Sequence, residues 1–328
     1  MSLARRGYGA VGRVARPLRL LVGAIATLLV VSIVTFALSN YKSPEGVARS
    51  ALGVFATQEQ LDAYVEEHGL DRPLHERYTS WLGDTLRGDL GTSQVTNRPV
   101  LEEIGPRLVR TVTLALGALL VALPISLALG VFMASRPFSW SDRALLVGTV
   151  SVAAMPEFVI GVAVLMLFGV QLGWLPVEST GIEFGGFFSE VKAYVLPITA
   201  LVIAVIPYLA RLTRAALREA LSAPYVQAAV LRGLSRKRVI WNHAMRQAAV
   251  PLASAVAITF INLLTGVVVI ENVFAFPGIG QSLVDAISNG DAVSIQAIVL
   301  VMGAAIISIN LAADVLVTRF DPRLRVRR

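Results

Sequence analysis

The stretch SAPYVQAAVLRGLSRKRVIWNHAMRQAAVP at residues 222–251 decides the fold, because it is a charged interruption between two long apolar runs. It is too long for a tight turn, and its five Lys and Arg residues carry too much charge to enter lipid. A basic, partly helical element of this kind can dock onto a partner in the cytoplasm. Composition alone favours a second interpretation, an amphipathic basic helix that rests on anionic lipid.

The local sequence of this stretch predicts a helix, a glycine turn and a second helix. Pro224 can begin a helix, and residues 225–231 are good helix formers. Gly233 fits the position just after a helix end, where a left-handed backbone costs glycine least. The second helix is expected over about residues 236–247, leading into an apolar span at Pro251.

The flanking apolar runs predict an all-α integral membrane protein. Of the 328 residues, 55% are hydrophobic and 16% are charged, whereas a soluble domain averages about 25% charged. A run of about 20 apolar residues crosses the hydrocarbon core as a helix. Six such spans are expected, at residues 18–38, 111–134, 144–170, 193–210, 249–274 and 293–318.

Prolines lie inside several of these spans. Pro124 and Pro156 fall in the second and third, and the short fourth span holds Pro197 and Pro207. A proline removes one backbone hydrogen bond and kinks a membrane helix unless neighbouring groups compensate. The ends of the fourth span are therefore the least well defined by sequence.

The distribution of Lys and Arg predicts the orientation in the membrane. The segments before span one, after spans two and four, and after span six together hold 20 of the 29 Lys and Arg residues. The segment between spans five and six has none. Both termini and the segment 222–251 are thus expected in the cytoplasm, and the positive charge follows from topology rather than from nucleic-acid binding. The N-terminal apolar run is expected to be an uncleaved anchor.

Residues 41–107 form a long extracytoplasmic insertion after the first span, with seven basic and eleven acidic residues. Helical spacing predicts one short amphipathic helix around residues 61–65 and a second around residues 78–86. Residues 69–74 separate the two helices, and residues 88–91 form a turn. The insertion is either a small cap on the membrane surface or a docking surface for an external partner.

The spacing of small residues in the segment 222–251 resembles a known motif. An Ala228-Ala229 pair is followed four residues later by Gly233, and 18 residues beyond that by Pro251. This resembles the EAA loop of binding-protein-dependent ABC importer permeases, with Gln227 where the name-giving Glu would be. With Tyr225 ahead, Arg232-Gly233-Leu234 in the middle and His243-Ala244 before the proline, it looks most like the oligopeptide/dipeptide permease subfamily.

Other stretches carry the same resemblance in the same order. They are GLDRPL, YTSWLGDTLRGDLGTS and RPVLEEIGPRL in the insertion, ENVFAFPGIG after span five, and Asn310, Asp314 and the run FDPR (residues 320–323) at the end. The resemblance therefore covers nearly the whole chain after about residue 18.

The resemblance implies the non-catalytic membrane subunit of an ATP-driven importer for short peptides. It implies a second homologous permease, two ATPase subunits or domains, and an extracytoplasmic substrate-binding protein as partners, besides membrane lipid. ATP and Mg would be bound by the ATPases, because this chain has no phosphate-binding loop motif; no cofactor is expected within it. The implied coupling residues, which receive the motion of an ATPase, are Tyr225, Gln227, Ala228, Ala229, Arg232, Gly233 and Leu234.

Polar residues inside spans are costly in lipid and indicate candidate pathway or gate positions: Glu157, Asn262, Glu271 and Asn310. Glu157 could line the pathway and meet a cationic group or backbone amides of a peptide, or be protonated or paired with a neighbouring helix. A gating or packing role is expected for Glu271. The two asparagines could hydrogen-bond between helices. The resemblance also places the binding protein over the insertion, with Asp71, Arg72, Trp81 and Asp89 as candidate contacts.

Other function classes have less support in the sequence. A secondary transporter or channel predicts internal repeats, and none is convincing here. An intramembrane enzyme needs a convergent catalytic set, and no catalytic motif or metal-ligand spacing is present among the three histidines and no cysteines. Within the importer class, glutathione and nickel or other metal chelates are alternative substrates to oligopeptides and dipeptides.

The expected organisation follows from these observations. It is a multi-pass protein of the inner or plasma membrane. Its parts are a cytoplasmic segment (1–17), a first transmembrane helix (18–40), the extracytoplasmic insertion (41–107), a permease core (108–318) with the coupling loop (211–248) between the fourth and fifth spans, and a cytoplasmic tail (319–328).

Overall fold

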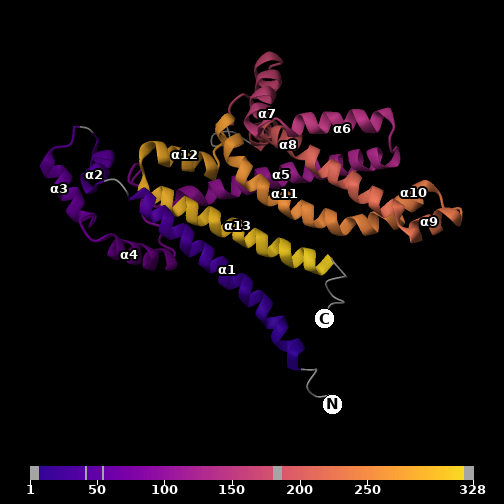
Figure 1. Cartoon of the computed structure of the whole chain (residues 1–328). Helices are drawn as coiled ribbons and strands as arrows, with labels where there is room; N and C mark the ends of the chain where they lie inside the picture. Colours follow the sequence, from indigo (N-terminus) through magenta and orange to yellow (C-terminus); the bar gives the residue numbers. More distant parts are fainter. Residues whose placement is uncertain (1–6, 41–42, 54, 180–186, 321–328) are drawn as a thin grey trace. The chain divides into compact units, whose positions relative to one another are not determined.

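The structure is a computed structural model that describes residues 7–40, 43–53, 55–179 and 187–320. Within these ranges it is helical, apart from an isolated bridge between Thr92 and Pro99. The helices are α1 (Gly7–Ser39), α2 (Pro44–Leu52), α3 (Gln58–Glu67), α4 (Leu74–Leu86), α5 (Val100–Ser135), α6 (Trp140–Ala153), α7 (Glu157–Val164), α8 (Phe187–Ser222), α9 (Pro224–Leu231), α10 (Arg236–Val239), α11 (Met245–Val273), α12 (Ile279–Asn289) and α13 (Ala292–Phe320) (Figure 1). Two π-helical stretches, Leu165–Gln171 and Ile240–Ala244, follow α7 and α10.

Five of the described helical segments are long and apolar enough to cross a membrane, and a bent pair brings the number to six if it counts as one span. The five segments are Leu21–Ser39, Val100–Ser135, Val191–Ser222, Arg236–Val273 and Ala292–Ala312. The all-helical membrane architecture expected from the apolar runs is therefore confirmed.

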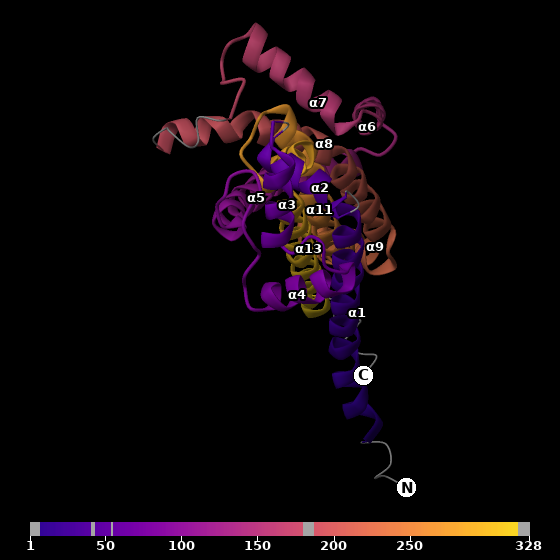
Figure 2. The same ribbon diagram turned by 90° about the vertical axis from the view of Figure 1, so that its left-hand side faces the viewer.

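The third span differs most from its expectation as one continuous helix. It is broken after α6, and α7 leaves α6 at an angle of 101° (Figures 1 and 2). Pro156 is the N-cap of α7 and is exposed, and a proline cannot donate a backbone hydrogen bond that would continue α6. Pro197 and Pro207, in contrast, lie inside the continuous helix α8, which is 36 residues long and extends well beyond the expected span.

The chain falls into two compact units, and the first comprises residues 1–110 and 278–311. It contains the insertion. Helices α3 and α4 confirm the two predicted short helices, and positive φ angles at Gly88 and Gly91 confirm the predicted turn. Helix α2 and helix α12 were not expected; α12 lies in the segment between spans five and six and ends at Gly290, which has the left-handed backbone of a C-cap.

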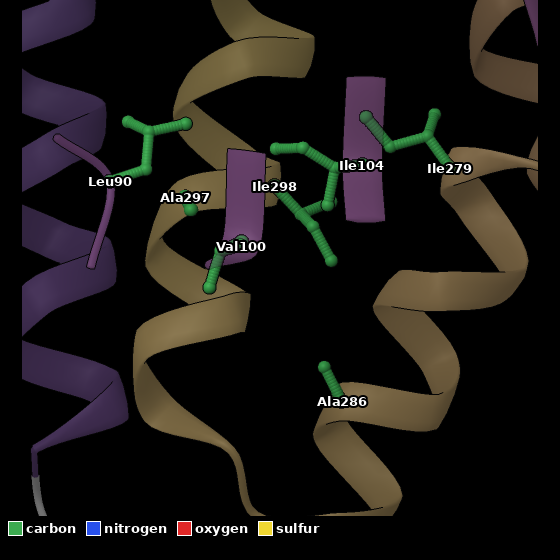
Figure 3. Close-up of a cluster of buried hydrophobic side chains, with 7 residues drawn as sticks. All are labelled: Leu90, Val100, Ile104, Ile279, Ala286, Ala297 and Ile298. Atoms are coloured by element: carbon green, nitrogen blue, oxygen red, sulfur yellow. The ribbon is translucent and has the colours of Figure 1, made fainter. Parts of the chain in front are cut away.

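A cluster of aliphatic side chains forms the core of the first unit. Residues from the turn before α5, the first turns of α5, and α12 and α13 meet there (Figure 3). The buried members are Leu90, Val100, Ile104, Ile279, Ala286, Ala297 and Ile298. Gly91 is needed beside this core, because a Cβ there would come within 2.8 Å of a Val293 methyl group, and its φ is +82°. The insertion is thus fixed to α12 and α13 by apolar packing.

Aromatic rings hold α4 against α1 within the same unit. The Phe36 ring meets the Tyr78 ring edge-on at 5.4 Å and the Trp81 ring at 5.7 Å, measured between centroids. Tyr78 also shares a 2.9 Å hydrogen bond with Ser32. Burial lowers the pKa of Arg77, whose guanidinium donates to the Asn40 side-chain oxygen at 2.5 Å.

The second unit comprises residues 111–277 and 312–328, and its described helices pack through small residues. The ends of α5, α8 and α11 meet around a buried cluster of Ala134, Ala216, Leu217, Ala220, Ala244, Ala248 and Leu252. About one turn before Ala134 on α5, Gly130 lies so close to α8 that a Cβ there would be 2.8 Å from the Ala210 carbonyl oxygen and still closer to Thr213. Close approach of backbones through small residues is the usual packing mode of membrane helices.

Candidate coupling element and pathway surface

The segment from Pro224 to Ala244, called here the coupling element, has the predicted helix, turn and helix. Helix α9 ends at Leu231, and Gly233 takes the left-handed conformation with φ of +79°. Its N–H donates to the Val230 carbonyl at 2.9 Å, which closes the turn. Helix α10 then leads through the π-helical stretch into α11, which continues past Pro251 without a break.

One face of α9 is buried within the element itself. Val226 and Ala229 pack with Val239 of α10, and Leu221, Ala223 and Leu234 cover the cluster. The sequence suggested that Ala228 and Ala229 together present a small-residue surface to a partner. The helical phase instead turns Ala229 inward, with 5% of its surface exposed, and leaves only Ala228 partly exposed.

The outer face and tip of the element are exposed and mixed in character. Leu231 is 88% exposed and Val230 is 56% exposed. Gln227, Arg232 and Gly233 are also exposed, and Leu234 is partly buried. Val230 and Leu231 thus form an exposed apolar tip, and the exposed basic residue Arg232 follows them in the chain.

Hydrogen bonds tie the coupling element to the long helices. The Tyr225 hydroxyl donates to the Gln247 side-chain oxygen of α11 at 2.5 Å. The Gln227 amide donates to the Ser222 carbonyl at the end of α8 at 3.2 Å. The Arg236 guanidinium donates to the carbonyl of Ser135, the last residue of α5. A displacement of the element would therefore pull on α5, α8 and α11 together.

A cavity of about 670 Å³ lies beside the element, at the junction of α8, α9 and the start of α11. Its lining includes Tyr225, His243, Gln247, Glu219 and Arg246. His243 lies in this lining, and no group of residues that could hold a metal ion occurs in the described part of the chain.

An ion pair that the sequence did not predict joins α6 to α8. The Arg214 guanidinium donates to both carboxylate oxygens of Asp142, at 2.6 and 2.8 Å, and Asp142 is 1% exposed. The Phe138 backbone N–H donates to the same carboxylate at 3.2 Å, and the Arg218 guanidinium lies 4.6 Å over the Phe138 ring. Bidentate geometry of this kind fixes both partners in direction as well as distance.

Glu157, the first candidate pathway residue, begins helix α7 and lies against α11. A Cβ built on Gly266 would meet the Glu157 carboxylate, with its Cδ only 3.0 Å away. A Cβ on Gly161, one turn further along α7, would meet Ile270 at 3.0 Å and Val273 at 3.4 Å. Helix α7 therefore runs parallel to the last turns of α11, and the Glu157 carboxylate lies over Gly266.

The other candidate pathway residues have different surroundings. Asn262 is exposed on α11, four residues before Gly266. Glu271 is fully buried and accepts a 2.5 Å hydrogen bond from the Thr111 hydroxyl, which favours packing over gating for this side chain. Asn310 is exposed on α13 in the first unit, and the side chain of Asp314 lies outside the described residues.

The candidate docking residues of the insertion also divide. Asp71 and Arg72 are exposed between α3 and α4. Trp81 packs its ring against Phe36, and the Asp89 carboxylate accepts a 2.8 Å hydrogen bond from the Gly91 N–H of its own turn. Trp81 and Asp89 thus stabilise the fold of the insertion, and Asp71 and Arg72 are the more accessible pair.

Asp291 anchors the insertion in the first unit and was missed in the sequence. Its carboxylate accepts hydrogen bonds from the Ser93 and Ser294 hydroxyls, at 2.5 and 2.7 Å, although Ser93 is 198 positions away. Burial, and then the Asp291 and Glu67 carboxylates, raise the pKa of the Tyr64 phenol, which therefore stays neutral. The local sequence, an acid just before a helix with Ser294 three residues later, indicates that Asp291 caps the helix. It does not indicate that Ser93 is a second partner.

Several of the described helices are long and apolar enough to cross a membrane, which is the architecture of a multi-helix membrane protein. The chain belongs to the family of binding-protein-dependent transport system inner membrane components, whose model matches residues 126–326. The model of the N-terminal part of such membrane components matches residues 16–115. The chain is thus a permease of the dipeptide/oligopeptide type, as its motifs indicated, and such permeases are non-catalytic membrane subunits of ABC transporters.

Curated relatives match along almost the full length. A protein of Sinorhizobium fredii named as a probable peptide ABC transporter permease, y4tP, is 34% identical over 94% of this chain and 98% of its own. The glutathione transport system permease protein GsiC of Salmonella choleraesuis is also 34% identical, over 94% and 98%. Among solved structures, a chain of the MetNI methionine ABC transporter, described as inward facing, is 21% identical with a TM-score of 0.54 over 68% of this chain and 98% of that one, which supports the fold.

Proposed function

We propose that this chain is the membrane-spanning subunit of an ABC importer for short peptides, and that its coupling element receives the motion of separate ATPase subunits. The observation that carries the proposal is the coupling element itself. Its apolar tip at Val230 and Leu231 is open, while its base is tied to α5, α8 and α11. A force applied at the tip would therefore reach three long helices at once.

The proposed cycle assigns the chemistry to partners. Two ATPase subunits or domains bind ATP and Mg, and a second homologous permease completes the pathway between the two membrane subunits. ATP binding closes the ATPases, moves both coupling elements and opens the pathway outward. Hydrolysis and product release reset the transporter, and the present chain forms no covalent bond to substrate at any step.

The proposed topology places both termini and the coupling element in the cytoplasm. The distribution of Lys and Arg supports this orientation. The insertion then lies outside, where an extracytoplasmic binding protein would deliver the substrate. Asp71 and Arg72 are its proposed contacts, because both are exposed at the junction of α3 and α4.

Two substrate classes have equal support from relatives. The y4tP relative is named for peptides and the GsiC relatives are named for glutathione, at 33–34% identity in each case. Glutathione is itself a tripeptide derivative with a free ammonium group, so one pathway could fit either class. We favour short peptides, and uptake of labelled tripeptide in competition with glutathione decides between them: competition by unlabelled tripeptide but not by glutathione is the expected result.

The coupling role is tested by changing Gly233 to Val. The φ of +79° is costly for a β-branched residue, so the turn that aims α9 would be lost. Peptide uptake into cells should be abolished, while the amount of the chain in the membrane, measured by immunoblot, stays near that of the unaltered protein. Gly148→Ala in α6 is the control, because a Cβ there meets nothing within 4 Å. Normal uptake by the Gly233 variant would count against the coupling role.

A further inference from the structure

The Glu157 carboxylate has no hydrogen-bond or ion-pair partner among the residues that the structure describes. It is exposed, although it begins a helix within a broken membrane span. The N-terminus of a helix favours a negative charge on a residue in its first turn. An ionised carboxylate is too costly to face hydrocarbon, so a charged Glu157 requires that the surface around it is in contact with water, substrate or protein.

The break in the third span supports the same conclusion independently. Between α6 and α7 the chain turns by 101°, and Ala154, Met155 and Pro156 are exposed at the corner. A helix end leaves backbone N–H and C=O groups without intrahelical partners. Irregular backbone at membrane depth is tolerated only where it is buried in protein or lines a water-filled cavity.

The exposed face of α11 beside Glu157 carries three polar side chains among its five exposed residues. Exposed residues recur on this helix at intervals of three and four, which is one helical face, and they are Ile258, Asn262, Thr265, Val269 and Asn272. Asn262 lies about one turn before Gly266 and Thr265 directly precedes it, and the Glu157 carboxylate lies over Gly266. Gly266 is seven residues from the end of α11 at Val273, or about 10 Å along the helix axis at 1.5 Å per residue.

We infer that Glu157, seated on Gly266 beside Asn262 and Thr265, forms a cation subsite on the pathway surface that selects peptides carrying a free ammonium or guanidinium group. The inference rests on the proposed function, since it requires that peptides pass this surface. The chemistry is that of a charge-assisted hydrogen bond, in which the N–H groups of the cation donate to the carboxylate oxygens. The adjacent amide and hydroxyl can accept further N–H groups of the same cation or of the peptide backbone.

Gly266 provides a second position at which the cation subsite can be tested. A Cβ at this position would overlap the Glu157 carboxylate but would meet only the far end of that flexible side chain. Gly266→Ala should therefore displace the charge and leave the helix pair intact. Because the two residues act through one contact, their effects should not add in a double-mutant cycle.

The test measures ATP-dependent uptake of four peptides into vesicles that contain the complete transporter and its binding protein. The peptides are Ala-Ala-Ala, its N-acetylated form, Ala-Lys-Ala and Ala-Gln-Ala. The unaltered transporter should prefer the free over the acetylated amino terminus, or the lysine over the glutamine peptide, and the pair that shows the preference identifies the cation. Glu157→Gln should reduce that preference by about tenfold, the factor that one charge-assisted hydrogen bond carries. The same binding protein serves all variants, so its own selectivity cancels in the comparison.

The variants separate the possible outcomes. Gly266→Ala should lose the preference as Glu157→Gln does, the double variant should lose no more, and Gly148→Ala should keep it. An unchanged preference in Glu157→Gln, or an equal loss of uptake for all four peptides, would overturn the cation subsite and leave the importer standing. A transporter that takes up none of the peptides while ATP is hydrolysed would overturn the proposed function and the subsite with it.

Discussion

At the scale of single residues, the ion pair of Asp142 and Arg214 joins two helices of the second unit. The Asp142 side chain is 1% exposed and that of Arg214 is 17% exposed, so water screens the pair poorly. Both carboxylate oxygens are engaged, and the Phe138 N–H adds a third hydrogen bond. The pair holds the start of α6 against α8, the helix that leads directly into the coupling element.

Removing one partner of this pair should be costly. Asp142→Ala leaves a largely buried guanidinium uncompensated, which typically costs about 3–5 kcal/mol. The measurement is the free energy of unfolding in detergent, followed by helical circular dichroism. The double variant Asp142→Ala/Arg214→Ala should recover part of the loss, because the uncompensated charge is gone. If the single variant and the unaltered chain have equal free energies of unfolding, the ion pair does not stabilise the folded chain.

Gly130 offers a test of the contact between α5 and α8. Gly130→Ala places a methyl group 2.8 Å from the Ala210 carbonyl and closer still to Thr213, so the helices must separate. Overpacking of this kind typically costs about 1–3 kcal/mol. The melting temperature of the purified chain should fall, whereas Gly148→Ala should leave it unchanged. A melting temperature that holds in the Gly130 variant would show that the two helices are less closely packed.

At the scale of elements, the coupling element separates an inner face that stabilises it from an outer face that remains available. Val226 lies on the inner face with no exposed surface, and Leu231 lies on the outer tip. The two positions belong to the same short helix, so they form a matched pair for separating folding from docking.

Leu231→Asp should leave stability within about 0.5 kcal/mol, the usual range for exposed positions, and should weaken association with the ATPase subunits. Val226→Asp should instead destabilise the element, because it buries a charge among Val239, Ala229 and Leu234. Thermal melting measures the stability of each variant, and co-purification of the ATPase with the tagged permease measures its association. If the ATPase still co-purifies with the Leu231→Asp variant, the apolar tip is not part of the docking surface.

The elements also show what sequence could and could not predict. The apolar runs predicted the spans because length and composition suffice for a membrane helix, and Pro224 with Gly233 predicted the coupling turn because both act locally. Proline alone did not predict the break, since Pro156 lies at the break as the N-cap of α7 and Pro207 lies inside a continuous helix. The partners of Asp142 and Asp291 could not be predicted, because they lie 72 and 198 positions away.

At the scale of the whole molecule, the proposed topology has a direct test because the chain contains no cysteine. Single cysteines at Leu231, in the coupling element, and at Leu86, in the insertion, would both be accessible. A membrane-impermeant maleimide should label only Leu86→Cys in right-side-out vesicles and only Leu231→Cys in inside-out vesicles, in the absence of partner subunits. Labelling of both positions from one side would contradict the orientation that the Lys and Arg residues predict.

The most direct test of the central claim is to purify the chain from its native membrane in mild detergent, tagged at its C-terminus, and to measure both its partners and their ATP hydrolysis. The account predicts recovery of a second permease, ATPase subunits and a binding protein, with ATP hydrolysis that substrate-loaded binding protein stimulates and that Gly233→Val uncouples. Recovery of the chain alone, as a stable homo-oligomer without ATPase activity, would contradict it.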